Sequence, residues 1–303
     1  MKIAVLYGGG GGEHAVSLAS GERVVEALIA RGHTVESFLL EKIELSPAMG
    51  RVLTASDAVF LALHGDGGED GTMQNLLEAA GIFHYTGSSP AASRLAMRKD
   101  AARECVATFG VPVARGAAVN KGEGVPAALS SPVVVKPIAG GSSIGLRILR
   151  TRAETDAFVA DEALLCEEYL SGREYSVSIL GKTALPPVEI RPRGGVYDYY
   201  HKYTAGATEE ICPVLLPPLV SEYMKTLARA AFAALGLRDY GRIDLREDAA
   251  GKPHFLEANT LPGLTATSLL PLAADVAGIS FPLLCERIAV LAAARKRIEK
   301  EEL

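Results

Sequence analysis

The chain has 303 residues, of which 49% are hydrophobic and 22% charged, and its formal net charge at pH 7 is -5. A chain of this length and composition can bury a substantial core and form two or three domains, which excludes a disordered or fibrous protein. The small negative charge, without any long run of basic residues, argues against nucleic acid and anionic membranes as partners.

A small α/β unit is predicted at the start of the chain. Strand patterns at 2–7, 34–40 and 57–63 alternate with amphipathic helices near 17–31 and 72–80, and a short strand leads to Gly87. Alternation of strands and helices is typical of a mostly parallel sheet that is covered by helices.

Helices and strands follow one another less regularly in the rest of the chain. A helix-rich stretch at 89–110 precedes strands at 113–119 and 132–136, a further strand after a glycine-serine turn, and a helix near 153–161. Strands are then expected at 163–169, 174–180, 184–190, 240–247 and 253–259, and helices at 218–235, 268–277 and 280–298. Residues 191–212 have weak periodicity, and a loop of that length inside a compact domain is usually functional or disordered.

A glycine-rich turn, LYGGGGGEH, joins the first strand to the first helix. One interpretation is the dinucleotide-binding start of a Rossmann fold, in which backbone N–H groups meet a pyrophosphate. Against it, the Glu13 carboxylate would repel phosphate, and no acidic residue follows a clear second strand at the usual spacing of about 20 residues. The alternatives are a generic tight turn and a site for a cationic group of a ligand.

The stretch GRIDLREDAAGKPHFLEAN predicts an antiparallel hairpin, because turn residues separate two strand-like runs. With a period of two, one face carries the polar set and the other the apolar set Ile243, Leu245, Leu256 and Ala258. The polar face consists of Arg242, Asp244 and Arg246 on the first strand and Phe255, Glu257 and Asn259 on the second. Two carboxylates and an amide oxygen suit Mg²⁺ or Mn²⁺, which complete their coordination with water and phosphate. The alternative is a solvated strand face with ordinary charges.

The stretch VVVKPIAGGSSIG places Lys136 at the end of a strand, before a glycine-serine turn that contains Ser142 and Ser143. It lacks the G-K-[S/T] of a Walker A loop and is followed by a strand pattern. Its backbone N–H and hydroxyl groups could cover phosphates while the lysine neutralises their charge, although such a turn is as often a mobile surface loop. Downstream, a strand ends in Glu167, Glu168, Tyr169 and Leu170, whose exposed backbone and carboxylates could bind an adenine edge and ribose hydroxyls.

A lysine before a glycine-serine flap, an acidic hinge strand and a carboxylate hairpin, in this order, resemble the ATP-grasp enzymes. The stretches HGDGGEDGT, VVVKPIAGGSSIG, YDYYHKY, GRIDL and FLEANTLPGLTATSLLP are similar to the motifs of the D-alanine:D-alanine ligases, and the resemblance covers essentially the whole chain. It implies an α/β fold, α+β in its ATP-grasp part. The expected domains are an N-terminal substrate domain at 1–87, a central ATP-grasp subdomain with the flap at 88–170, and a C-terminal subdomain with metal site and lid loop at 171–303.

The resemblance also implies the reaction. Members of the family use ATP to phosphorylate the carboxylate of one D-alanine, and the amine of a second attacks the acyl phosphate to give D-alanyl-D-alanine for peptidoglycan. Related ligases take D-lactate, D-serine or another second substrate. A dinucleotide-binding dehydrogenase and a non-catalytic nucleotide-binding module are alternatives from other classes.

By this resemblance, individual residues acquire expected roles. Two Mg²⁺ or Mn²⁺ ions would be held by Asp244, Glu257 and Asn259. ATP would be bound by Lys99, Lys136, Ser142, Ser143, Glu167, Glu168, Leu170, Glu174 and Lys202. The reacting groups would be served by Glu13, Ser142, Tyr203, Arg242 and the Gly263 N–H. The first D-alanine would meet Glu13 and His64, and the second would meet Ser268 and the Leu269 backbone. A tyrosine at position 203 favours the dipeptide, because relatives that make D-alanyl-D-lactate carry histidine there.

The compartment and the assembly are expected from equally simple features. The four cysteines form no C-x-x-C pair, no apolar stretch reaches about 18 residues, and the first strand follows Met1 without a leader pattern. We therefore expect a cytoplasmic protein without a membrane span, and the resemblance implies a homodimer.

Overall fold

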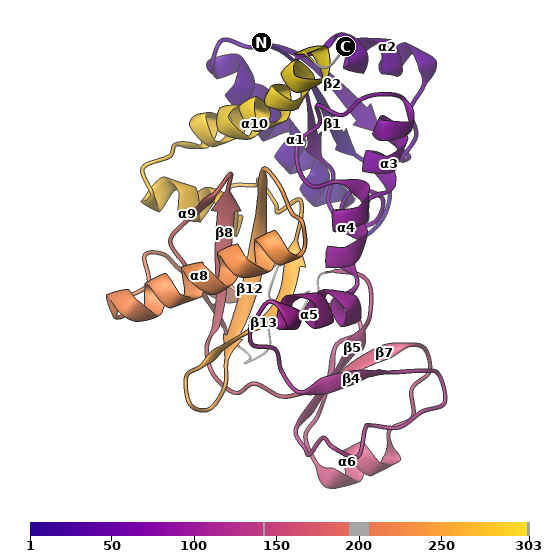
Figure 1. Cartoon of the computed structure of the whole chain (residues 1–303), viewed down its shortest axis with the longest axis vertical. Coiled ribbons are helices and arrows are strands. Elements are labelled where there is room, and N and C mark those ends of the chain that lie inside the picture. The colour runs from indigo at the N-terminus through magenta and orange to yellow at the C-terminus, as the bar shows by residue number, and fades with distance from the viewer. Residues whose placement is uncertain (142, 194–205, 302–303) are drawn as a thin grey trace.

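The computed structural model of the chain describes residues 1–141, 143–193 and 206–301. The described residues form three sheets, which follow one another along the longest axis of the molecule (Figure 1). The sheet nearest both termini lies at the top, the sheet containing the β12–β13 hairpin lies in the middle, and the β4–β7 sheet lies at the bottom. The sheets at the middle and the bottom enclose the cavity described below.

The N-terminal sheet is parallel, as the alternating pattern predicts. Its strands are β1 (Lys2–Gly8), β2 (Thr34–Leu40) and β3 (Ala58–Ala62), in the order β2-β1-β3. Three helices accompany them, α1 (His14–Ala30), α2 (Pro47–Ala55) and α3 (Thr72–Ala79). The sequence patterns had not indicated α2, and the strand expected before Gly87 is reduced to a single bridge between Val59 and Tyr85.

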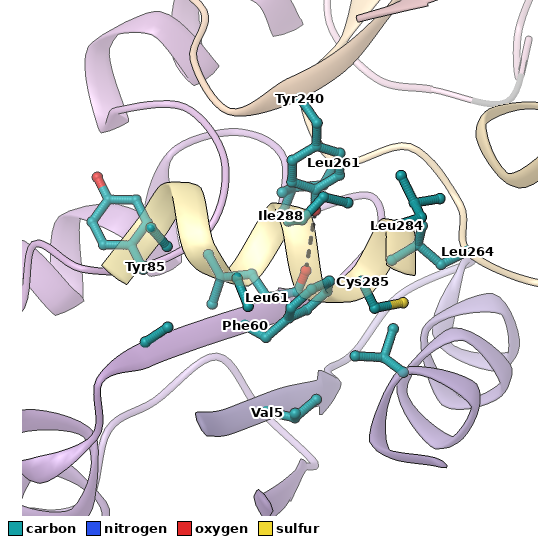
Figure 2. Packing of buried hydrophobic residues seen from close by; sticks show 14 of the residues in the cluster. Val5, Phe60, Leu61, Tyr85, Tyr240, Leu261, Leu264, Leu284, Cys285 and Ile288 are labelled. Carbon is teal, nitrogen blue, oxygen red and sulfur yellow. Dashed lines mark hydrogen bonds between the residues drawn. The ribbon is translucent and has the colours of Figure 1, made fainter. Parts of the chain in front are cut away.

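The last helix, α10 (Phe281–Glu301), packs on this first sheet although it is farthest from it in sequence. Figure 2 shows Leu284, Cys285 and Ile288 of α10 among residues of β1 and β3. All three α10 side chains are fully buried in the same hydrophobic cluster as Phe60 and Leu61. The N-terminal unit therefore takes part of its core from the C-terminal end of the chain.

Two helices lead from the first unit to the sheets that follow. They are α4 (Pro90–Met97), which Ser89 caps, and α5 (Lys99–Thr108), and extended backbone at Arg98 separates them. The β4–β7 sheet, at the bottom of Figure 1, is antiparallel, with the order β4-β7-β5-β6. Its strands are β4 (Gly116–Val119), β5 (Val133–Pro137), β6 (Arg147–Leu149) and β7 (Leu164–Glu168). The short helix α6 (Arg152–Ala157) begins with a capping box formed by Thr151 and Glu154.

The middle sheet contains the predicted hairpin. Its strands are β8 (Glu174–Leu180), β9 (Thr183–Ala184), β10 (Val188–Pro192), β11 (Thr208–Ile211), β12 (Tyr240–Glu247) and β13 (Pro253–Asn259). The order is β11-β10-β8-β12-β13, and β9 pairs with β8. Helix α8 (Pro218–Ala234) packs on one face, and α9 (Leu269–Val276) follows the hairpin. The opposite face of the hairpin is thereby left to the cavity.

The described part of the chain contains no single helix with the length and apolarity needed to cross a bilayer. Helix α9 and residues 281–296 of α10 reach that length and composition only together, and the chain bends by 105° between them.

Candidate active site

A cavity lies between the β4–β7 sheet and the β12–β13 hairpin. Nine of the residues expected to bind nucleotide or metal line it together: Lys99, Lys136, Ser143, Glu167, Glu168, Leu170, Glu174, Asp244 and Glu257. They come from four separate stretches of sequence, so the structure brings the predicted motifs to one place. Its wall also contains apolar side chains, including Val134, Ile148 and Leu256, which suit the face of a base.

The base of the cavity holds a buried group of charges. The Lys136 Nζ lies 2.7 Å from Glu167 Oε2, and the Arg103 Nε lies 3.1 Å from Glu167 Oε1. Lys136 and Glu167 are only 7% and 5% exposed. The expectation of an exposed Glu167 carboxylate is therefore wrong, because Lys136 and Arg103 enclose it. Glu167 can instead fix the direction in which Lys136 points. Arg103 on α5 had not been predicted, since nothing in its local sequence marks it.

The two other acidic residues at this edge are also paired with arginines. Glu168 accepts hydrogen bonds of 2.9 Å from the backbone N and the Nε of Arg115. Burial raises the pKa of Glu168, but these hydrogen bonds outweigh that effect and hold its pKa below the usual range. Glu174 accepts a hydrogen bond of 3.0 Å from Arg246 Nη1, its neighbour across β8 and β12.

The glycine-serine turn is tied to the start of α5 and reaches the first glycine loop. The backbone N–H of Lys99 donates to Ile138 O at 2.8 Å, and its Nζ donates to Gly140 O. A Cβ placed on Gly141 would lie 3.4 Å from Glu13 Oε1, so the turn lies beside that carboxylate. Ser142 lies outside the described residues, as do Lys202 and Tyr203.

The hairpin has the predicted pairing at its polar end and a different one beyond it. Asp244 is opposite Glu257, and Arg242 is opposite Asn259, but a bulge shifts the register after Asp244. Beyond the bulge Phe255 pairs with Leu245 and is buried in the core. The prediction that Phe255 belongs to the polar face is therefore wrong.

Leu256 is the corresponding error on the other face of the same strand. It had been placed among the packed apolar residues, but it lines the cavity. Ile243 and Leu245 are fully buried on the packed face, as predicted, and Ala258 packs against them. The extra residue of the bulge explains both errors, because it reverses the alternation of side chains.

The three expected metal ligands form an oxygen-only set on this hairpin. Asp244 accepts hydrogen bonds from Ser176 Oγ at 2.8 Å and from Arg242 Nε at 2.9 Å. Asn259 Oδ1 accepts from the Leu261 N–H at 3.0 Å, and Glu257 Oε2 lies 3.9 Å from Lys99 Nζ. Within the described ranges no three His, Cys, Asp or Glu side chains are grouped to hold an ion by themselves. The donors fit Mg²⁺ that takes its remaining ligands from phosphate and water.

Glu13 stands immediately before α1, facing the loop after β3. Its side chain does not cap the helix, and a Cβ placed on Gly65 would lie 3.5 Å from it. Close by, Glu69 is buried, and burial raises its pKa above the usual range. The Glu13 carboxylate raises the pKa of Glu69 further, whereas the His64 ring, whose Nδ1 lies 3.8 Å from Glu69 Oε1, lowers it. Glu69 had not been singled out, although its glycine-rich loop at the end of a strand marks a site position.

His64 is 5% exposed, and protein groups meet both ring nitrogens. Nδ1 lies 2.8 Å from Leu261 O, and Nε2 lies 2.9 Å from Ser20 Oγ. In this arrangement the ring joins two segments of the protein. The geometry favours a positioning role for His64, and its expected contact with substrate stays a prediction.

The loop after the hairpin carries the last predicted residues. A Cβ on Gly263 would lie 2.7 Å from Ser268 Oγ, so a larger residue cannot fit without displacing that side chain. Ser268 Oγ accepts from the Thr265 N–H at 3.0 Å and does not cap α9, which begins at Leu269. Gly263, Ser268 and Leu269 thus lie together where α9 starts.

The chain and its fold are similar to known proteins. A family model described as D-ala D-ala ligase C-terminus matches residues 106–290, which is more than half of the chain. The chain belongs to the D-alanine:D-alanine ligase family. The D-alanine–D-alanine ligase of Geobacter sulfurreducens is 42% identical over 302 residues, which cover 96% of this chain and 94% of that protein. The D-alanine–D-alanine ligase of Acidiphilium cryptum is 43% identical over 305 residues, which cover 97% of this chain and 99% of that protein.

Solved structures of the ligase family confirm the predicted fold class. A D-alanine–D-alanine ligase from Bacillus anthracis complexed with ATP is 29% identical, with a TM-score of 0.83 and full coverage of both chains. The VanG D-Ala:D-Ser ligase from Enterococcus faecalis is 26% identical, with a TM-score of 0.81 over 96% of this chain and 99% of the other. The arrangement of a small parallel sheet followed by two antiparallel ATP-grasp sheets is therefore that of the family.

Proposed function

We propose that this chain is an ATP-dependent ligase that joins two D-alanines to D-alanyl-D-alanine, a precursor of peptidoglycan. One observation carries the proposal beyond family membership. The glycine-serine turn over the cavity is tied to Lys99 and also lies beside Glu13. A site for an anionic nucleotide and a site for an ammonium group thus adjoin beneath one turn, as phosphorylation of an amino acid by ATP requires.

The nucleotide end of the site fits a triphosphate. Lys99 and Lys136 neutralise phosphate charge, and the apolar wall of the cavity receives the adenine. The carboxylates Asp244 and Glu257 with Asn259 would hold two Mg²⁺ or Mn²⁺ ions. When bound, these ions neutralise charge on the phosphates and orient them.

At the amino acid end, we assign the ammonium group of the first D-alanine to Glu13. Arg242 and the Gly263 N–H supply fixed donors for the charge that develops on the reacting carboxylate, where such donors have their largest effect. Ser268 and the Leu269 N–H receive the carboxylate of the second D-alanine. His64, Ser142, Ser143, Lys202 and Tyr203 keep the roles that the resemblance implies, with Lys202 and Tyr203 closing over the site to exclude water.

The second substrate separates this proposal from its nearest alternative. The likeness to the VanG structure favours D-serine as a competitor, but that chain is only 26% identical, whereas ligases named for D-alanine reach 43%. We expect ADP release with D-alanine alone to exceed that with D-alanine plus D-serine or D-lactate, measured by a coupled assay at several pH values. Preferred use of D-serine or D-lactate at neutral pH would overturn the choice of D-alanine.

We propose that residues 1–87, 88–170 and 171–303 act as substrate domain, central subdomain and C-terminal subdomain of a homodimer in the cytoplasm. Light scattering of the purified protein measures the assembly directly.

Arg246 gives a testable prediction about the nucleotide. It donates to Glu174 at 3.0 Å and to the Tyr169 hydroxyl at 3.3 Å, and its guanidinium lies 5.3 Å from the Tyr169 ring centroid. A hydrogen bond to a charged group contributes about 1.5–3 kcal/mol of free energy. Without Arg246, Glu174 would lose this bond and its fixed placement in the proposed ATP site. We expect Arg246→Met to raise the KM for ATP about tenfold or more with little change in the KM for D-alanine. Arg229→Met, at an exposed ion pair on α8, is the control. An unchanged KM for ATP would contradict this function of Arg246.

A further inference from the structure

Two buried side chains anchor the first half of the loop between β13 and α9, one on each side of Gly263. Leu261 and Leu264 are fully buried, and both point into the core beside α10 (Figure 2). Leu261 lies near Tyr240 and Ile288 in that view. Gly263, with its proposed donor N–H, lies between the two anchors. Any movement of Gly263 is therefore limited by what holds the peptide groups of Leu261 and Leu264.

His64 holds the first of these peptide groups. The Leu261 carbonyl can only accept a hydrogen bond, so the proton on the His64 ring must be on Nδ1, 2.8 Å away. In a neutral ring Nε2 then accepts, and the donor is the Ser20 hydroxyl at 2.9 Å. The direction of each bond follows from the one before it.

Helix α1 holds both peptide groups that flank Leu264. The Leu264 N–H donates to Ser20 Oγ at 3.1 Å, and Arg23 Nη1 donates to Leu264 O at 2.5 Å. The Arg23 guanidinium is itself held 4.0 Å over the ring of Phe281, the first residue of α10. Ser20 is fully buried, so its hydroxyl serves the histidine and the loop at the same time.

The same helix also begins at the proposed ammonium site. Glu13 immediately precedes α1, and Ser17 Oγ donates to the backbone carbonyl of Glu13 at 3.3 Å. The same hydroxyl accepts from the backbone N–H of His64 at 2.9 Å. Residues 17, 20 and 23 are three apart and share one face of the helix. The interval from Glu13 to Arg23 corresponds to about 15 Å of helix at about 1.5 Å per residue. Helix α1 thus connects Glu13 at its start with the loop that contains Gly263.

We propose that Ser20 and Arg23 are positioning residues of the ligation reaction. They fix the Leu261–Leu264 loop on α1, so that the Gly263 N–H and the Glu13 carboxylate keep one relative placement. The proposal rests on the proposed function, because it assigns a purpose to the alignment of those two groups. A displacement of about 1 Å can lower the rate about a hundredfold without removing a catalytic group.

The test compares Arg23→Met and Ser20→Ala with the unaltered enzyme, with ATP and D-alanine as substrates. We expect each variant to lower kcat about tenfold while the KM for ATP stays within about twofold. We also expect more than one ADP for each dipeptide. A misaligned acyl phosphate waits longer for the second amine, so water attacks it and gives free D-alanine and phosphate. Arg23→Lys keeps a donor for Leu264 O and should recover part of the coupling between ADP and dipeptide.

The controls separate positioning from folding. Arg31→Met removes an exposed ion pair with Glu286 just beyond the end of the same helix and should keep the kcat and coupling of the unaltered enzyme. If Arg23→Met and Arg23→Lys lose activity only in proportion to the unfolded fraction, with one ADP per dipeptide, the positioning proposal is overturned. Unchanged kcat and coupling in both overturn it as well. Failure of the unaltered protein to make dipeptide would instead contradict the proposed function.

Discussion

Replacing Glu257 by glutamine is expected to lower kcat for dipeptide synthesis on the order of a thousandfold while the protein stays folded. The neutral amide weakens the oxygen-only set that Glu257 forms with Asp244 on the facing strand. Charge stabilisation by a bound metal ion contributes several kcal/mol to a transition state, and each 1.4 kcal/mol corresponds to about a factor of ten. The fold should lose little, because the Glu257 side chain is 28% exposed and its ion pair with Lys99 is 3.9 Å long.

The measurement is kcat over a range of Mg²⁺ and Mn²⁺ concentrations, together with thermal unfolding. Higher metal concentration should restore part of the activity if the carboxylate binds the ion. The matched control is Glu222→Gln, which makes the same chemical change at an exposed ion pair on α8. Near-normal activity of Glu257→Gln at low Mg²⁺ would refute the metal assignment.

The hairpin shows how far local pattern predicts structure. Both strands begin and end where the sequence predicted, because alternating apolar residues and a turn-rich connection define them locally. The bulge after Asp244 has no such signal, since it depends on how β13 meets β12. The prediction therefore identified the two facing carboxylates and misplaced Phe255 and Leu256.

Other differences between the sequence predictions and the structure also arise from tertiary contacts. Strand β11 has few residues and exists by pairing with β10, which a weakly periodic stretch does not reveal. Helix α10 was predicted as a helix, but its packing on the first sheet depends on contacts across most of the chain. The placement of Gly141 beside Glu13 likewise cannot be read from either local motif. The charge of Glu13 argued against phosphate in the sequence, and the fold supplied its neighbours.

The charges beneath the cavity lead to the second large expected effect. Lys136→Met should lower kcat/KM for ATP by about 10² to 10³, because a fixed positive charge at the proposed phosphate site is lost. It should also lower the melting temperature. Methionine keeps the packing but leaves Glu167, which is 5% exposed, with Arg103 as its remaining partner among these three charges. Breaking a buried pair typically removes about 3–5 kcal/mol of stability, and Arg103 makes the loss here smaller.

A second substitution separates the two effects of Lys136. Adding Glu167→Gln to Lys136→Met removes the uncompensated carboxylate, so the melting temperature should return toward that of the unaltered protein. Activity should stay low, because no positive charge has been restored at position 136. Glu167→Gln alone completes the double-mutant cycle. This variant should be less stable than the unaltered protein, because Lys136 and Arg103 lose their buried counter-ion. Recovery of kcat/KM in the double variant would mean that Lys136 acts only as the counter-ion of Glu167, and its assignment to phosphate would then be wrong.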